Sequence, residues 1–265
     1  MEKNKAYNYS QEFYETDRDY FNEIENKQFN DYWFKDYLSV ILSNTKSNDK
    51  ILECGCGTGI TTASLYKKRR KVLGIDFSKK FIAKANQRGK FFRVMDITNL
   101  NLPAKEFDLV CSADLIEHIH ELEKAMSEMD WVLKDKGILV LQCPNLFTNF
   151  FSVNYKKTLK NRIKKISNLF LEIANTKLRT IKEYELDVVN GDKDAYNLIS
   201  PIWLKKYLEK KGYKIRMLNT YALYFKPNIL LRGLIFILSK LPLTKYLGGR
   251  IILVAQKNPN GRNKK

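Results

Sequence analysis

An apolar run that leads into a glycine-rich loop constrains this chain more than any other feature. Residues 51–59 read ILECGCGTG, so a short strand pattern is followed by glycine at positions 55, 57 and 59. Glycine lets the backbone turn tightly and come close to a ligand, because it has no Cβ. Residues 60–66 then predict a helix whose first amide groups face that ligand. The acidic Glu53 disfavours a phosphate ligand and suits one with an amine or a positive charge. The spacing also differs from the dinucleotide fingerprint GxGxxG.

Strand and helix patterns alternate after this loop. We expect strands over residues 51–54, 72–75, 91–95, 107–112 and 138–143, then over 213–218 and 250–256. Helices are expected over 60–68, from Ser78 to 87, over 122–133 and over 201–211, with Ser78 and Ser200 as N-caps and Gly137 stopping the third. This order predicts an α/β fold: a Rossmann-like, seven-stranded, mostly parallel sheet with helices on both faces. Ligands of such sheets bind at the carboxyl ends of the strands.

Two regions lie outside this alternation. Residues 1–46 are aromatic and acidic, and apolar residues recur at helical spacing over 30–42, which predicts an N-terminal helical cap. It either packs on the sheet or covers a ligand site. Within a main domain of residues 47–265, residues 145–193 predict a basic helical insertion after the fifth strand, and 230–247 form a second basic, apolar segment.

The net charge of +18 is unevenly distributed. Residues 1–150 hold 22 basic and 22 acidic side chains, whereas residues 151–265 hold 25 basic and 7 acidic ones. The glycine loop lies in the neutral half, residues 1–150. The excess positive charge of residues 151–265 therefore indicates the kind of partner that this half contacts. We expect either an anionic membrane surface, RNA or a merely solvated lysine-rich face.

The four cysteines indicate buried apolar positions, not a metal site or a disulfide framework. Three of them, Cys54, Cys111 and Cys143, end predicted strands, and Cys56 makes a CxC with the first. No run of about 18 apolar residues and no signal peptide is visible. We therefore expect a cytoplasmic protein, with peripheral association at the inner membrane surface as the membrane alternative.

The pattern ExGxGxG resembles motif I of the class I S-adenosylmethionine (SAM) methyltransferases, within the group that includes ubiquinone-type O-methyltransferases. The resemblance covers about residues 48–145 and, more loosely, 200–257. It implies SAM as the cofactor. It also implies roles for residues at the ends of the first four strands, namely Glu53, Gly55, Cys56, Gly57 and Gly59 near the methionine part, Asp76 on the ribose, Phe77 on the adenine face, Asp96 and Ile97 at the adenine amino group, and Asp114 and Leu115 beside the methyl donor.

The segment after the fourth strand supplies the candidate catalytic group. His118 can act as a general base on an acceptor hydroxyl, since an unperturbed imidazole titrates near pH 6.5. The alternative is that His118 only packs or caps, while His120 faces solvent. Asp114-x-x-Glu117-His118 also resembles the ExxEH metal motif of small-RNA 2′-O-methyltransferases, but no histidine follows His120. No metal ligand is assigned.

The sequence constrains the methyl acceptor less than it constrains the cofactor. Residues 194–201, DAYNLISP, resemble a DHxNLFSP stretch of glycan and quinone methyltransferases, with Ala195 in place of the histidine. A small-molecule or lipid- or glycan-linked acceptor, methylated on oxygen, is therefore the first hypothesis. A metal-free RNA methyltransferase and an inactive SAM-binding protein are the alternatives. Oligomeric state is not predicted.

Overall fold

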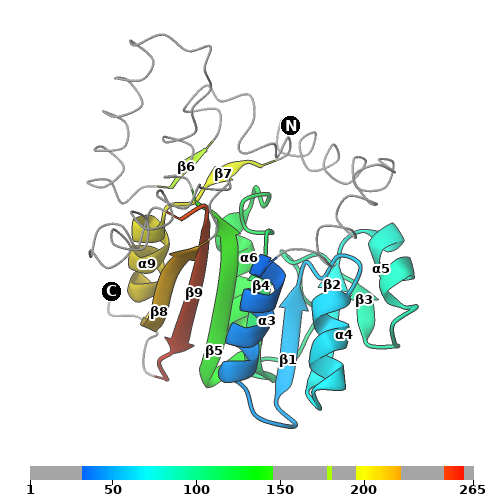
Figure 1. Cartoon of the computed structure of the whole chain (residues 1–265). Coiled ribbons are helices and arrows are strands. Elements are labelled where there is room, and N and C mark those ends of the chain that lie inside the picture. The colour runs from blue at the N-terminus through cyan, green and yellow to red at the C-terminus, as the bar shows by residue number, and fades with distance from the viewer. Residues whose placement is uncertain (1–31, 146–177, 181–194, 222–247, 260–265) are drawn as a thin grey trace, which may run out of the picture.

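The computed structural model describes residues 32–145, 178–180, 195–221 and 248–259. A seven-stranded sheet forms its centre (Figure 1). The strands are β1 (Lys50–Cys54), β2 (Lys71–Asp76), β3 (Phe92–Val94), β4 (Phe107–Ala113), β5 (Leu133–Pro144), β8 (Tyr213–Tyr221) and β9 (Arg250–Lys257). The predicted α/β fold class and sheet are confirmed.

The strand order is β3-β2-β1-β4-β5-β9-β8. Strands β1 to β5 pair in parallel, β9 pairs antiparallel with both β5 and β8, and β8 therefore runs with the first five. Because β9 runs the other way, its first residue, Arg250, pairs with Pro144 at the end of β5. The start of β9 thus reaches the same edge as the carboxyl ends of β1, β2 and β4.

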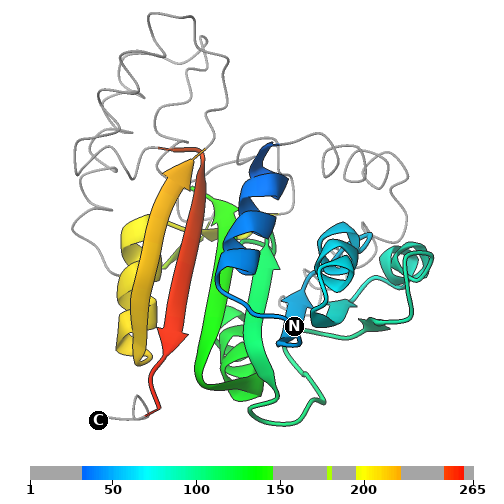
Figure 2. The same ribbon diagram turned by 60° about the horizontal axis from the view of Figure 1, so that its bottom comes forward.

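Helices cover both faces of the sheet (Figure 2). On one face lie α3 (Tyr32–Ser43) and α4 (Ile60–Lys67), with Tyr37 and Leu65 buried against strand residues such as Ile51. On the other lie α6 (Leu122–Val132) and α9 (Pro201–Lys210). Helix α5 (Lys79–Ala85) packs by β3. Strand β1 shows why: Ile51 faces the first layer and Leu52 the second, as the two-residue strand period requires.

The prediction that Gly137 stops the third helix is wrong. Helix α6 ends at Val132, and Gly137 lies inside β5, which begins at Leu133. A Cβ on Gly137 would lie 2.7 Å from the Leu133 side chain and 2.8 Å from the Lys134 carbonyl oxygen. The glycine therefore makes room for the start of the strand. A second difference is β3, which spans only 92–94, so Asp96 lies in a turn two residues beyond it.

The sequence did not predict a second, two-stranded sheet. Strands β6 (Arg179–Thr180) and β7 (Asn197–Leu198) pair antiparallel, and β7 immediately precedes α9. Strand β6 falls within the predicted insertion. The rest of that insertion, the first 31 residues of the predicted cap and the segment 230–247 lie outside the described residues. Helix α3, at the end of the cap, packs on the sheet through Tyr37 and Ile41.

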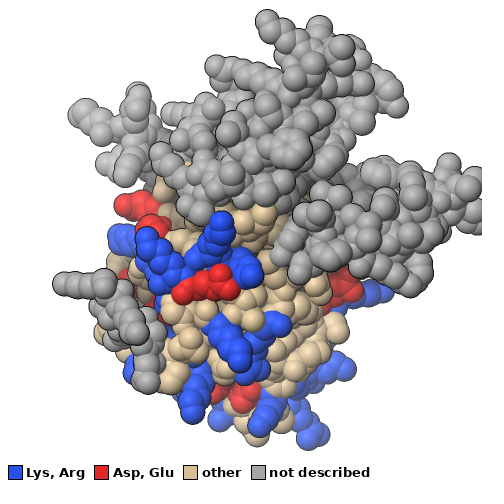
Figure 3. All heavy atoms as spheres, turned by 90° about the vertical axis from the view of Figure 1, so that its left-hand side faces the viewer, with Lys and Arg blue, Asp and Glu red and all other residues tan. Residues whose placement is uncertain are grey.

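Charges of both signs share the surface at the β8 edge of the sheet. Figure 3 shows lysine and arginine side chains interspersed with acidic ones there. Lys211 lies 2.8 Å from Glu123, and Lys205 lies 3.9 Å from Glu209. The described part of this edge is therefore mixed in charge, and any uniformly basic surface has to draw on the remaining residues.

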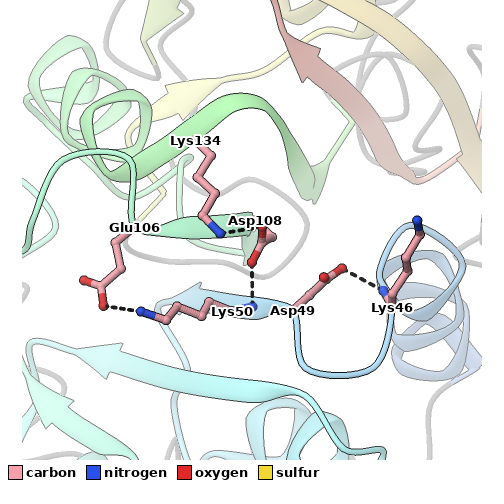
Figure 4. A network of polar contacts seen from close by, with 6 residues as sticks. All are labelled: Lys46, Asp49, Lys50, Glu106, Asp108 and Lys134. Carbon is pink, nitrogen blue, oxygen red and sulfur yellow. Dashed lines mark hydrogen bonds and ion pairs between the residues drawn. The ribbon is translucent and has the colours of Figure 1, made fainter.

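A network of ion pairs lies at the amino ends of the parallel strands, which we call the amino edge (Figure 4). It is opposite the carboxyl edge, where the strands end. Lys50 at the start of β1 pairs with Glu106 at 3.2 Å, and its main-chain N–H donates to Asp108 at 2.9 Å. Lys134 pairs with Asp108 at 2.6 Å. These contacts join the starts of β1, β4 and β5 to one another.

Candidate cofactor site at the carboxyl edge of the sheet

The glycine loop forms a turn between β1 and α4 that is bonded to the neighbouring strand. Gly55, Gly57 and Gly59 have φ of 72°, 51° and 80°, in the left-handed region that favours glycine. The amides of Gly55 and Cys56 both donate to the Ile75 carbonyl oxygen at 2.9 Å. Helix α4 then begins at Ile60 without a hydrogen bond from an N-cap side chain.

Side chains beneath the loop hold it in this shape. A Cβ on Gly59 would lie 2.5 Å from the Phe92 ring and 2.9 Å from Ala85. Cys56 is 3% exposed and packs with Phe92 and Ala85, and burial raises the pKa of its thiol. Arg88 donates to the Thr58 carbonyl oxygen at 3.0 Å. Cys56 thus supports the loop from the protein side, as a buried apolar residue.

Asp76, at the end of β2, is oriented by main-chain amides. One carboxylate oxygen accepts from Gly57 N at 3.0 Å and the other from Ser78 N at 2.9 Å. The side chain is 9% exposed. Ser78 in turn caps α5 by accepting from Phe81 N. The acid and the glycine loop therefore form one rigid unit.

Asp96 lies next to this unit. The Met95 amide donates to the Asp76 carbonyl oxygen at 3.0 Å, which ties the turn after β3 to the end of β2. Asp96 accepts from both the amide and the hydroxyl of Thr98, at 2.8 and 2.9 Å. Ile97 is 7% exposed and packs in the core, so its main chain is the part that a ligand can meet. Phe77 is half-buried.

Glu53 lies deeper than the other acids. It is 4% exposed, and the Thr62 hydroxyl of α4 donates to it. Burial raises the pKa of Glu53 to about 7, against hydrogen bonds from Thr62 and Thr61 that lower it, while nearby Asp76 raises it further. Burial raises the pKa of Tyr37 in α3, and the nearby Cys111 and Glu53 add to this rise. A positive group bound at the loop would stabilise the ionised form of Glu53.

The segment after β4 closes the site from the other side. Asp114 has a φ of 50° and pairs with Arg250, which the sequence analysis did not select. The Asp114 amide also donates to the Gln142 carbonyl oxygen at 3.0 Å. The next residue, Leu115, lies over the glycine loop: a Cβ on Gly55 would be 3.1 Å from its Cδ1. Asp114 is therefore 136 residues from its partner, and only the reversed direction of β9 brings the two together.

His118 lies in the same segment. Its side chain is 9% exposed, and Nε2 is 3.8 Å from the Glu117 carboxylate, which is itself buried. The His118 amide donates to the Leu115 carbonyl oxygen at 2.9 Å. The prediction that His120 faces solvent is wrong, because the residue is half-buried and its ring centroid lies 3.9 Å from that of Tyr196, with the two ring planes tilted by 38°. Among the described residues, no group of three His, Cys, Asp or Glu is placed to hold a metal ion.

Comparison with known proteins decides the family. A model described as a methyltransferase domain, of the type 11 group, matches residues 52–141, which include the loop, all four acids and His118. Residues 52–141 therefore carry a methyltransferase domain of the class I SAM-dependent type. The matched region coincides with β1 to β5, whose carboxyl ends form the site just described.

Relatives of this chain differ in what their names say they act on. A phosphatidylethanolamine N-methyltransferase from Cereibacter sphaeroides is 35% identical over 100 residues, covering 35% of this chain and 49% of that protein. A ubiquinone biosynthesis O-methyltransferase from Pelagibacter ubique is 28% identical over 131 residues, covering 47% and 54%. The chain spans about half the length of the curated relatives it matches.

Solved structures confirm the fold. A SAM-dependent methyltransferase from Methanosarcina mazei superposes with a TM-score of 0.56 at 19% identity, covering 83% of this chain and 97% of that one. At this identity the likeness concerns the architecture alone.

The residues present fit SAM, the family's cofactor. SAM offers hydrogen-bond donors in its ammonium, ribose hydroxyl and adenine amino groups, and the edge offers the carboxylates of Glu53, Asp76 and Asp96 as acceptors. The hydrogen bond from the Gly57 amide to Asp76 places an acceptor beside the middle of the glycine loop. Bound there, SAM would supply an electrophilic methyl group on a sulfonium.

Proposed function

We propose that this protein transfers a methyl group from SAM to an oxygen of a small-molecule or lipid- or glycan-linked acceptor. One observation carries the proposal: a carboxylate at the end of β2 is held by the glycine-loop amide, beside Glu53 near the end of β1 and Asp96 after β3. This arrangement binds a ligand rich in donors and positive charge. Methyl transfer then needs alignment and exclusion of water more than a reactive side chain.

Two independent observations support this acceptor class. Two relatives carry names that refer to a phospholipid and to ubiquinone biosynthesis. The chain itself pairs a neutral cofactor half with a basic half, whose segments 145–193 and 230–247 combine lysine and arginine with leucine, isoleucine and phenylalanine. Such segments suit an anionic membrane surface. We therefore propose a cytoplasmic protein that meets its acceptor at that surface. Among the described residues, no helix is long and apolar enough to span a bilayer.

His118 is the proposed general base. It lies three residues beyond Leu115, which covers the glycine loop, and Glu117 is near enough to attract a proton taken up on the imidazole. A hydroxyl acceptor loses its proton on methylation, and His118 can take up that proton. An acceptor that is already anionic would have no need of such a base.

Label transfer tests the function directly. Purified protein is incubated with methyl-tritiated SAM and an extract of its source cells, which is then separated into organic-soluble, water-soluble small-molecule and RNA fractions. We expect label in the organic-soluble or small-molecule fraction, and none with Asp76→Ala. Label confined to RNA would replace the proposal with the RNA alternative. No transfer to any fraction, with SAM shown to bind, would favour an inactive SAM-binding protein.

A further inference from the structure

Asn197 of β7 holds the loop that carries Leu115 and His118. Its side chain is 4% exposed, and its amide nitrogen donates to the carbonyl oxygens of Ile116 at 3.0 Å and Ile119 at 2.7 Å. Its main-chain N–H donates to the Glu117 carbonyl oxygen at 2.8 Å, as does that of Tyr196 at 2.7 Å. Four hydrogen bonds thus join two consecutive residues to a four-residue stretch of the loop.

The bonded residues belong to the segment 114–121, which lies between β4 and α6 and is neither helix nor strand. This segment starts at Asp114, which has a positive φ, and ends before α6 begins at Leu122. Leu115 nevertheless touches the glycine loop, so a shift of the stretch would move the wall of the cofactor site. Within this stretch, buried carbonyl oxygens need donors, and the Asn197 amide supplies both of its hydrogens.

Asn197 also connects this stretch to a different part of the chain. Its strand β7 pairs with β6, with Thr180 opposite Asn197 and Arg179 opposite Leu198. Strand β6 belongs to the region between β5 and α9, where the sequence predicts the insertion beside the acceptor. Two residues further on, Ile199 is buried in the core and Ser200 caps α9, so β7 has a fixed anchor on one side.

We propose that Asn197 is a positioning residue, which sets the 115–119 stretch against the cofactor loop and links it to the β6–β7 sheet. The proposal rests on the proposed function, since it concerns the same site. Asparagine is needed because both contacts are to carbonyl oxygens: aspartate has the same shape but presents acceptors to acceptors. Without the two buried donors, the stretch either moves or keeps unpaired carbonyl oxygens. Because the stretch forms a wall of the cofactor site, we expect the affinity for the cofactor to fall by about tenfold.

The test compares Asn197→Asp with Asn44→Asp, titrating each with S-adenosylhomocysteine, the demethylated form of the cofactor, by calorimetry. Asn44 makes the same kind of bond, to the Val40 carbonyl oxygen at 2.8 Å, but follows α3. Both variants are expected to melt at a lower temperature. Only Asn197→Asp is expected to weaken binding, by about tenfold. Unchanged affinity in a folded Asn197→Asp protein would overturn the proposal.

A measurement on the unaltered chain covers the case in which Asn197→Asp does not fold. Linkage is reciprocal, so a stretch that sets cofactor affinity must itself be stabilised by the cofactor. Hydrogen exchange at the Tyr196 and Asn197 amides is therefore expected to slow when S-adenosylhomocysteine binds. Slowing at residues 55–60 alone would show that β7 is only structural. No binding by the wild-type chain would instead contradict the proposed function.

Discussion

The amino and carboxyl edges of the parallel strands differ in how exposed their charged side chains are and in what those side chains bond to. At the amino edge, Lys50 pairs with Glu106 and Lys134 with Asp108, and these side chains are 28–47% exposed. At the carboxyl edge, Glu53 and Asp76 are 4% and 9% exposed, and they are held by a threonine hydroxyl or by main-chain amides.

This difference separates a structural use of charge from a functional one. Exposed pairs of opposite charge are neutralised where they stand and contribute little to stability. Buried acids cost free energy unless they are bonded, and amides and a hydroxyl here bond them in defined orientations. Substitutions at the carboxyl edge should therefore alter ligand binding, and those at the amino edge only stability.

The largest effect is expected from Gly59→Ala. The new Cβ needs a positive φ and would lie 2.5 Å from Phe92, so the loop has to move. We expect a loss of about 3 kcal/mol in the free energy of unfolding, and no detectable cofactor binding. Denaturant unfolding and calorimetry measure the two. Adding Phe92→Leu should recover part of the stability, and no recovery would show that the overlap is not the cause.

The next effect concerns the pH dependence of stability through Glu53. Its pKa is about 7 in the folded protein and about 4.5 ordinarily, so the folded state holds a proton that the unfolded chain releases between these values. The stabilisation is complete below about pH 4.5 and is lost as pH rises through about 7, by about 3 kcal/mol.

Glu53→Gln should remove this component, so that its melting temperature falls less than that of the wild type between pH 5 and 8. Glu106→Gln, at the amino edge, is the control and should follow the wild-type curve. Parallel curves for Glu53→Gln and the wild type would contradict the burial of Glu53.

The two edges are compared most simply by Asp76→Ala and Asp108→Ala. The first removes the acid bonded to the glycine loop, and should weaken cofactor binding at least tenfold, about 1.4 kcal/mol. The second removes the acid bonded to Lys50 and Lys134, and should lower the melting temperature while affinity stays unchanged. Equal affinities for the two variants would mean that the edges do not differ in the way described.

The smallest effect is expected from Lys134→Ala. Burial raises the pKa of Asp108, but the bonds from Lys134 and Lys50 outweigh it and hold the pKa below its ordinary value. The pair thus stabilises the fold above the ordinary aspartate pKa, and the stabilisation is lost as pH falls through the folded pKa. We expect a loss of about 0.5 kcal/mol at pH 7 that shrinks in acid. A loss that persisted at low pH would point to packing instead.

Local pattern was sufficient for most of the fold and for the cofactor side of the site. Strand, acid, loop and helix follow one another within residues 50–67, so short-range spacing predicts their positions. The same holds for Asp76 and for the N-caps Ser78 and Ser200, both of which accept from the amide three residues on.

Contacts across long stretches of sequence were not predictable. Arg250 meets Asp114 because β9 runs antiparallel beside β5, and Asn197 meets Ile116 from 81 residues away. Gly137 was wrongly predicted to end a helix. Glycine often follows the last residue of a helix, but here its missing Cβ leaves room for the Leu133 side chain. Only the tertiary structure distinguishes these cases.

Calorimetric titration of the wild-type chain with S-adenosylhomocysteine tests the central claim most directly, which is that the carboxyl edge of β1, β2 and β3 is a cofactor site. The account predicts saturable binding of one molecule per chain in the micromolar range, weakened by Asp76→Ala and unaffected by Asp108→Ala. Absence of binding at about 1 mM ligand, where even a weak site is occupied, would contradict it.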